Sequence, residues 1–249
     1  MNDQPASPDL HGRTALVTGA SRGIGRAVAV ALAQAGARCI LVARTQGGLE
    51  QTDDLIRQHA KQDAVLLPLD LLDGERLDTL GPSIALQEGG LDILVHCAGE
   101  LGLLSPLPHI RPQDMERALH AGPGVTWRLI RTLAPLLERS QAGRAVFLTD
   151  RHACQPAPFW GMVAASRAAQ DAIVRTWAQE LPPHSALRIN LFEPGMVATR
   201  LRRLAMPALD MASLTTPQAI APQIIRLCLP GPQPQGCYVQ AVPEPELHA

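Results

Sequence analysis

The stretch that decides the fold is Thr-Ala-Leu-Val-Thr-Gly-Ala-Ser-Arg-Gly-Ile-Gly at residues 14–25. An apolar run, a glycine-rich turn and the start of an alanine-rich helical segment follow one another here. Glycines let a backbone turn sharply and approach a pyrophosphate, while the first turn of a helix offers free N–H groups to anions. The stretch therefore predicts a nucleotide-binding turn, with a plain tight turn as the alternative. Its expected contact residues are Gly19, Ser21, Arg22, Gly23, Ile24 and Gly25.

Outward from this turn, short Val/Ile/Leu-rich runs alternate with segments of helical period. The runs predict strands at 13–18, 37–43, 64–69, 91–96, 143–149, 186–192 and 236–241. The periodic segments predict helices at 23–35, 46–60, 74–88, 112–138, 159–181 and 217–229. Alternation of this kind is typical of β-α units wound on both faces of a parallel sheet. We expect one doubly wound α/β domain of about seven strands over 13–249, preceded by a flexible arm at 1–12.

Composition excludes several classes of protein. The formal net charge of -1 is spread without long runs of one sign, which argues against a nucleic-acid-binding surface. The five cysteines contain no Cys-x-x-Cys pair and predict reduced thiols, with neither disulfides nor a metal site. No apolar stretch reaches the roughly 18 to 20 residues that span a membrane. We expect a soluble, cytoplasmic protein.

The ends of the second and third predicted strands indicate which dinucleotide would bind. Arg44 stands where an NAD site offers an acidic side chain to the ribose, and an arginine suits the 2′-phosphate of NADP instead. Arg22 would supply a second contact by charge-assisted hydrogen bonding. If both arginines are ordinary surface residues, NAD stays open. Asp70 ends the third strand near the expected adenine, unless it only caps a helix.

Several separated motifs resemble the short-chain dehydrogenase/reductase family. These are Thr18-Gly-x-x-x-Gly23-x-Gly25, the run Leu91 to Gly99 with His96 and Cys97 in place of the asparagines of an Asn-Asn-Ala-Gly turn, and Pro194-Gly195-x-x-x-Thr199. The resemblance implies a Rossmann-type fold and a homodimer or homotetramer paired through the long helix. It adds cofactor contacts at Ala98, Gly99, Arg167, Pro194, Gly195 and Thr199.

The same resemblance shows that the family's four chemical side chains are replaced. The family uses a tyrosine as proton donor, a lysine that lowers its pKa and holds the nicotinamide ribose, a serine that orients the substrate, and an asparagine that holds a water. Their positions here are Val163, Arg167, Asp150 and Gly122, respectively. Arg167 is still expected to donate to ribose hydroxyls. An Asp150–Arg167 ion pair would fill the vacated centre, unless Asp150 faces solvent.

The loss of the tyrosine–lysine pair does not depend on this alignment. The chain has one tyrosine, Tyr238, and one lysine, Lys61, in the reverse order, so no Tyr-x-x-x-Lys motif exists. Valine has no proton to give, and arginine, with a pKa above about 12, does not release one at neutral pH. Loss of a general acid typically costs about 100- to 10,000-fold in rate. Ordinary carbonyl reduction is therefore expected to be very slow or absent.

Three hypotheses of function follow. The first is an NADP(H)-binding family member with a degenerate site, acting as a sensor or structural partner. The second is an active oxidoreductase that uses Asp150, His152 or a water held by Arg167. The third is a scaffold that has lost nucleotide binding.

Two further segments have open interpretations. Gly122-Pro123-Gly124 predicts a broken or kinked helix, because proline costs about 3 kcal/mol inside a helix. Residues 197–217 stand where the family folds a substrate lid. Their three arginines, at 200, 202 and 203, would meet an anionic small molecule or simply cover a helical surface.

Overall fold

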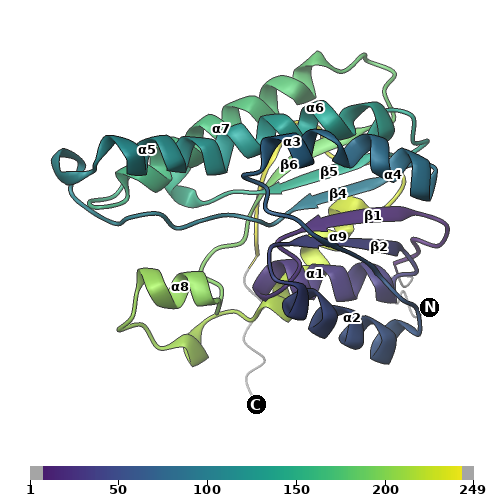
Figure 1. Ribbon diagram of the computed structural model, residues 1–249, viewed down its shortest axis with the longest axis horizontal. Coiled ribbons are helices and arrows are strands. Elements are labelled where there is room, and N and C mark those ends of the chain that lie inside the picture. Colours follow the sequence, from purple (N-terminus) through teal and green to yellow (C-terminus); the bar gives the residue numbers. More distant parts are fainter. Residues whose placement is uncertain (1–7, 243–249) are drawn as a thin grey trace, which may run out of the picture.

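A seven-stranded parallel sheet forms the centre of the computed structural model, which describes residues 8–242 (Figure 1). Its strand order is β3-β2-β1-β4-β5-β6-β7, and every neighbouring pair is parallel. The strands are β1 (Thr14–Thr18), β2 (Arg38–Ala43), β3 (Val65–Pro68), β4 (Ile93–His96), β5 (Arg144–Leu148), β6 (Arg188–Glu193) and β7 (Tyr238–Gln240). All seven lie within the predicted runs or overlap them, so the predicted fold class is confirmed.

Helices cover both faces of the sheet (Figure 1). They are α1 (Gly23–Gln34), α2 (Gln46–Ala60), α3 (Gly74–Asp78), α4 (Leu80–Glu88), α5 (Pro112–Leu119), α6 (Val125–Leu137), α7 (Gly161–Glu180), α8 (Arg200–Ala205) and α9 (Pro217–Cys228). Along β1, Val17 faces a core shared with α1 and α9, while Leu16 faces a second core shared with α6 and α7. This period of two is what a strand buried on both faces requires.

The strand order reverses at β1, and this reversal places the site. The chain builds β2 and β3 on one side of β1, then crosses back to place β4 on the other side. The connections after β1 and β4 therefore diverge to opposite faces of the sheet. Ligands of open α/β sheets bind in the crevice that such a reversal opens at the carboxyl ends of the strands.

Of the two outcomes predicted for Gly122-Pro123-Gly124, a broken or a kinked helix, the break is wrong. The long helix continues from α5 to α6 through a π-helical turn at His120–Gly124, and its flanking residues Leu119 and Val125 keep right-handed helical angles. A π turn shifts the hydrogen-bond ladder locally, so a proline without an N–H group fits without ending the helix. The segment 74–88 also differs from the prediction, since it forms two helices that meet at Thr79.

The predicted flexible arm lies only partly within the described residues. Residues 1–7 fall outside them, whereas Leu10 is fully buried and donates its N–H to the Ala35 carbonyl over 2.7 Å. The last part of the predicted arm is thus docked at the end of α1, because Leu10 completes the core on that face. Within residues 8–242, no helix combines the length and the apolarity that a membrane crossing requires.

Candidate functional site

The glycine turn after β1 is shaped by close backbone contacts. Gly19 has a φ of +68°, and a Cβ atom there would lie 2.8 Å from the Ala98 backbone nitrogen. A Cβ atom on Gly25 would collide with the Gly19 carbonyl oxygen. Only glycine satisfies both constraints, since the first position needs a left-handed backbone and the second needs α1 to press against the turn. The free N–H groups at the start of α1 consequently face the crevice.

A cleft of about 640 Å³ opens above this turn, at the carboxyl ends of the central strands. All the residues predicted to contact a cofactor line it: Gly19, Ser21, Arg22, Gly23, Ile24, Gly25, Arg44, Asp70, Ala98, Gly99, Arg167, Pro194, Gly195 and Thr199. Sequence positions as distant as 19 and 199 thus meet in one place. Their contacts with a cofactor stay a prediction.

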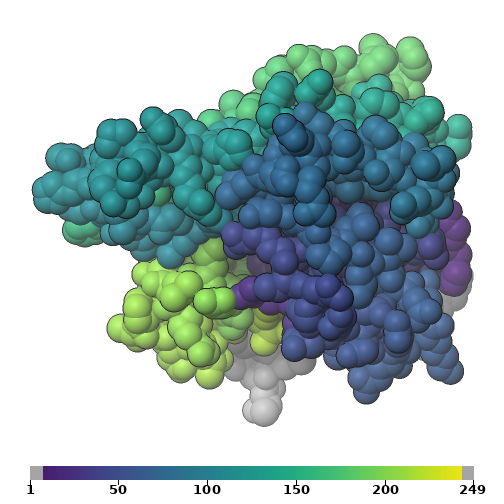
Figure 2. Space-filling view, in the orientation of Figure 1, coloured from purple at the N-terminus to yellow at the C-terminus, as the bar shows by residue number. Residues whose placement is uncertain are grey.

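The helix α8 forms one wall of the cleft. Thr199 begins this helix by accepting the Arg202 backbone N–H on its side-chain oxygen over 3.2 Å. Arg202 is buried and lines the cleft, and Ala121 lines it from the other side. Figure 2 shows the yellow-green segment that carries α8 lying below the teal segment that carries α5. Of the three arginines in the expected lid, Arg200 and Arg202 line the cleft and Arg203 does not.

At the β2 end of the cleft, Arg44 is already engaged by a carboxylate. Its Nη1 lies 3.3 Å from Glu100 Oε1. The Arg117 Nε and Nη2 atoms donate to the two oxygens of the same carboxylate over 3.0 and 2.9 Å, and this pairing raises the pKa of Arg117. Sequence reasoning missed Glu100, because nothing in the order of residues shows that it reaches Arg44.

Asp70 and Arg22 complete this end. Asp70 accepts the Leu72 backbone N–H over 3.1 Å, so it caps a turn while it lines the cleft. The alternative of a helix cap is wrong, because Asp73 caps the following helix α3, and the contact of Asp70 with an adenine stays a prediction. Arg22 is exposed at the start of α1 and also lines the cleft.

At the other end of the cleft, Val163 and Arg167 stand side by side on α7. Val163 is 9% exposed and presents only methyl groups. Arg167 Nη1 donates to Gln170 Oε1 over 2.8 Å and to the Leu148 carbonyl over 3.3 Å. Burial lowers the pKa of Arg167, although Asp150 and Asp171 oppose the shift. Because Nη1 satisfies these neutral oxygens, the rest of the guanidinium group can face the cleft.

The predicted Asp150–Arg167 ion pair is wrong. Asp150 caps the 3-10 turn Arg151–Ala153 by accepting the His152 backbone N–H over 2.9 Å, and it also bonds to the His152 ring. Its second oxygen lies 4.0 Å from Arg202 Nη2. Burial opposes ionisation of Asp150, yet the bonds from His152 and the charge of Arg202 outweigh it and lower the pKa. Asp150 therefore pairs with His152, two residues along the chain, rather than with Arg167.

The two histidines nearest the site are both enclosed. The His152 ring is buried and stacks on Trp160, with 4.0 Å between ring centres, so it lies behind Asp150 rather than in the cleft. His96 Nδ1 lies 2.7 Å from Thr18 Oγ1, and burial together with Arg167 lowers the pKa of His96 to about 3. Among the described residues, no group of three or more His, Cys, Asp or Glu side chains is placed to hold a metal ion.

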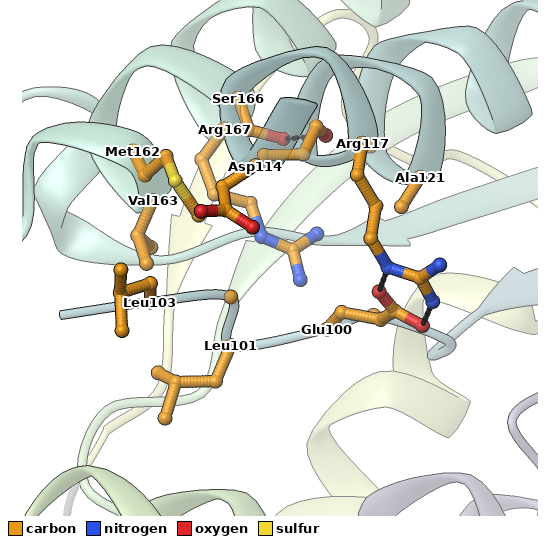
Figure 3. Close-up of a pocket in the computed structure, with 14 residues that line it drawn as sticks. Glu100, Leu101, Leu103, Asp114, Arg117, Ala121, Met162, Val163, Ser166 and Arg167 are labelled. Atoms are coloured by element: carbon orange, nitrogen blue, oxygen red, sulfur yellow. Dashed lines mark hydrogen bonds and ion pairs between the residues drawn. The ribbon is translucent and has the colours of Figure 1, made fainter. Parts of the chain in front are cut away.

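A second cavity of about 230 Å³ adjoins the cleft between α5, the π turn and α7 (Figure 3). Val163 and Arg167 line both spaces. Gly122, which the family resemblance aligns with the asparagine, also lines this cavity and packs against Ser166. Ser166 Oγ donates to the Ala118 carbonyl over 2.9 Å. The structure thus brings together three of the four positions that the family resemblance predicts to be degenerate, and Asp150 lines the larger cleft nearby.

Comparison with known proteins agrees with this geometry. Residues 13–209 match the family model described as short chain dehydrogenase. The curated relatives include the uncharacterized oxidoreductase YciK of Escherichia coli K12, which is 35% identical over 224 residues, 89% of this chain and 88% of that protein.

Solved structures give the same result and include nucleotide complexes. A short chain dehydrogenase from Escherichia coli CFT073 complexed with NADPH has a TM-score of 0.90 at 33% identity, covering 96% of this chain and 100% of the other. One from Shigella flexneri 2a complexed with NADP has a TM-score of 0.89 at 32% identity, covering 94% and 98%. The chain belongs to the short-chain dehydrogenase family.

Proposed function

We propose that this protein binds NADP(H) in the 640 Å³ cleft and does not carry out the family's carbonyl reduction. The observation that carries the proposal is the contrast between the two ends of one cleft. The glycine turn and the α1 N-terminus are built as a dinucleotide requires. The proton-transfer end presents Val163 and Arg167.

The cofactor end supports binding of the phosphorylated dinucleotide. Arg44 at the end of β2 and Arg22 in the glycine turn are exposed cations that line the cleft. A guanidinium group binds a phosphate through paired, charge-assisted hydrogen bonds. Relatives of the same fold were solved with NADP and NADPH. When bound, the nicotinamide would supply the hydride chemistry of the family, and Arg167 would hold the adjoining ribose in place of the lysine.

The residues at the proton-transfer end of the cleft support the proposed absence of carbonyl reduction. Val163 cannot donate a proton to a substrate oxygen, and an arginine at 167 stays charged in the neutral range. Asp150, at the serine position, has a lowered pKa and is therefore an acceptor rather than a donor at neutral pH. His152 is enclosed between Asp150 and Trp160. Neither Asp150 nor His152, the two side chains considered as substitutes, is therefore placed as a ready acid in the cleft.

The biological role that fits these properties is a sensor of NADP(H) or a structural partner of another protein. Pairing into a homodimer or homotetramer, as the family does, and a cytoplasmic location belong to the same proposal. The 230 Å³ cavity beside Val163 offers room for a small-molecule ligand.

Calorimetric or fluorescence titration of the purified protein with NADPH tests the proposal. We expect saturable binding in the micromolar range, together with no turnover of a broad carbonyl and alcohol panel. No saturation below millimolar NADPH would favour the scaffold that has lost its nucleotide. Robust NADPH-dependent turnover, traced to this chain by its co-elution with the protein, would show an active oxidoreductase.

A further inference from the structure

The ion pair between Arg44 and Glu100 crosses the mouth of the cleft. Arg44 follows β2 and Glu100 lies in the connection after β4, while β1 lies between those two strands in the sheet. Neighbouring strands are about 4.8 Å apart, so a bond between the residues that follow β2 and β4 must pass over the end of β1. The glycine turn begins at that end, and both side chains line the cleft. The pair therefore lies across the dinucleotide groove.

Glu100 is held firmly on the far side of this pair. Arg117 of α5 binds both of its oxygens, over 3.0 and 2.9 Å (Figure 3). Arg44 reaches one oxygen through a single nitrogen at 3.3 Å. Planar two-point pairing is the stronger arrangement. Of the two ion pairs that Glu100 forms, the weaker one, with Arg44, is therefore the first to break. Arg44 is 59% exposed at its side chain and is free to take another partner.

We propose that Glu100 sets the cofactor specificity of this cleft by competing with the 2′-phosphate of NADP(H) for Arg44. This inference rests on the proposed function, since it concerns the same nucleotide. A phosphate that binds Arg44 either displaces the Glu100 carboxylate or approaches it closely enough to be repelled. NAD(H) carries no such phosphate and leaves the Arg44–Glu100 pair in place. Glu100 thus weakens the binding of NADP(H) and reduces the preference of the cleft for it.

The structure allows a matched set of variants. Glu100→Gln keeps the shape of the side chain and removes its charge. Glu116→Gln removes a charge from the residue before Arg117 on α5, at an exposed position outside the cleft. It therefore controls for a change in the overall electrostatic field of the protein. Arg44→Gln removes the shared cation. None of these side chains belongs to the protein core, and circular dichroism verifies the fold of each variant.

Dissociation constants for NADPH and NADH, measured side by side by calorimetry, test the inference. Exposed ion pairs shift an equilibrium by up to about fivefold, and removal of a charge beside a phosphate adds to this effect. We expect Glu100→Gln to tighten NADPH binding by about five- to tenfold and NADH binding by less than about twofold. Glu116→Gln should change neither by more than about twofold. In the Arg44→Gln background, the added Glu100→Gln change should lose most of its effect.

The outcomes separate this inference from the function on which it rests. An unchanged NADPH-to-NADH ratio in Glu100→Gln, or an equal change in Glu116→Gln, would overturn the inference while NADPH binding by the wild type still stands. If neither the wild type nor Glu100→Gln saturates with NADPH below millimolar concentration, the proposed function is wrong and the inference falls with it. Saturation by Glu100→Gln alone would support the competition and contradict NADP(H) binding by the wild type.

Discussion

Gly122 lies so close to Ser166 that a Cβ atom at position 122 would overlap the Ser166 Oγ atom. The hydroxyl is fixed there by its bond to the Ala118 carbonyl. The space next to the π turn, where the family resemblance places an asparagine side chain, is therefore taken by a serine from α7. The missing asparagine reflects a repacked contact between two helices rather than an empty position.

The first prediction concerns this contact. Gly122→Asn should lower the free energy of unfolding by about 1–3 kcal/mol, the usual cost of forcing extra atoms into a packed site. Urea unfolding at pH 7.5 measures the change. Ser166→Ala removes the overlapping oxygen, so the double variant should recover a large part of the loss. A Gly122→Asn protein as stable as the wild type would show that α7 moves away freely.

The second prediction concerns the buried His96. Its pKa is about 3 in the folded protein, against about 6.5 in an unfolded chain, so the unfolded state takes up the proton first. The contribution of neutral His96 to the free energy of unfolding is therefore fully present above about pH 6.5 and is lost as the pH falls towards 3. The loss between pH 7.5 and pH 5 is about 2 kcal/mol. His96→Asn, which keeps a polar group opposite Thr18, should remove that loss in urea unfolding at the two pH values.

A control for the loss of an imidazole is His184→Asn, at an exposed position. The two variants should differ in how their stability changes with pH. Parallel pH profiles for wild type, His96→Asn and His184→Asn would contradict the second prediction.

The third prediction has the opposite sign and concerns Asp171. This carboxyl group is 5% exposed, and neither of its oxygens makes a hydrogen bond with a described group. Burial raises its pKa to about 6; the nearby Thr149 hydroxyl lowers it somewhat, although its geometry falls short of a hydrogen bond. The protonated form is thus favoured by folding. Its contribution to stability is full below about pH 4 and is lost as the pH rises through 6.

Asp171→Asn replaces the buried charge with a neutral group of the same shape. We expect the variant to be more stable than the wild type by about 1–2 kcal/mol at pH 7.5, and nearly equal to it at pH 4.5. Thermal unfolding at both pH values measures the difference. A variant that is less stable at pH 7.5 would indicate that the carboxylate is ionised and well solvated in the fold. Because His96 and Asp171 have opposite effects between pH 4 and 6, each needs its own variant.

The sequence predicted the features that depend on local pattern. Short Val/Ile/Leu-rich runs predicted all seven strands of the described sheet, and the glycine turn with the other motifs predicted part of the residues that line the cleft. The sequence did not predict features that depend on which of several nearby side chains forms an ion pair, or on how a helix accommodates a proline. Asp150 takes His152 instead of Arg167, Arg44 takes Glu100, and Pro123 is absorbed by a π turn. These outcomes depend on distances between segments, and residue order does not specify them.

The fourth prediction is a partial recovery of chemistry in the double variant Val163→Tyr and Arg167→Lys. Both positions line the cleft, and the second cavity gives a larger side chain at 163 room to turn. A phenol beside an amine restores the donor and the group that lowers its pKa. We expect NADPH oxidation with an activated carbonyl compound at least about tenfold above the wild type. The rate should stay far below that of a complete site, because Asp150 and Gly122 remain.

The control is Val163→Phe with Arg167→Lys, which supplies the ring without its hydroxyl and should show no gain. Equal rates for the two double variants would show that the tyrosine hydroxyl donates no proton in this cleft.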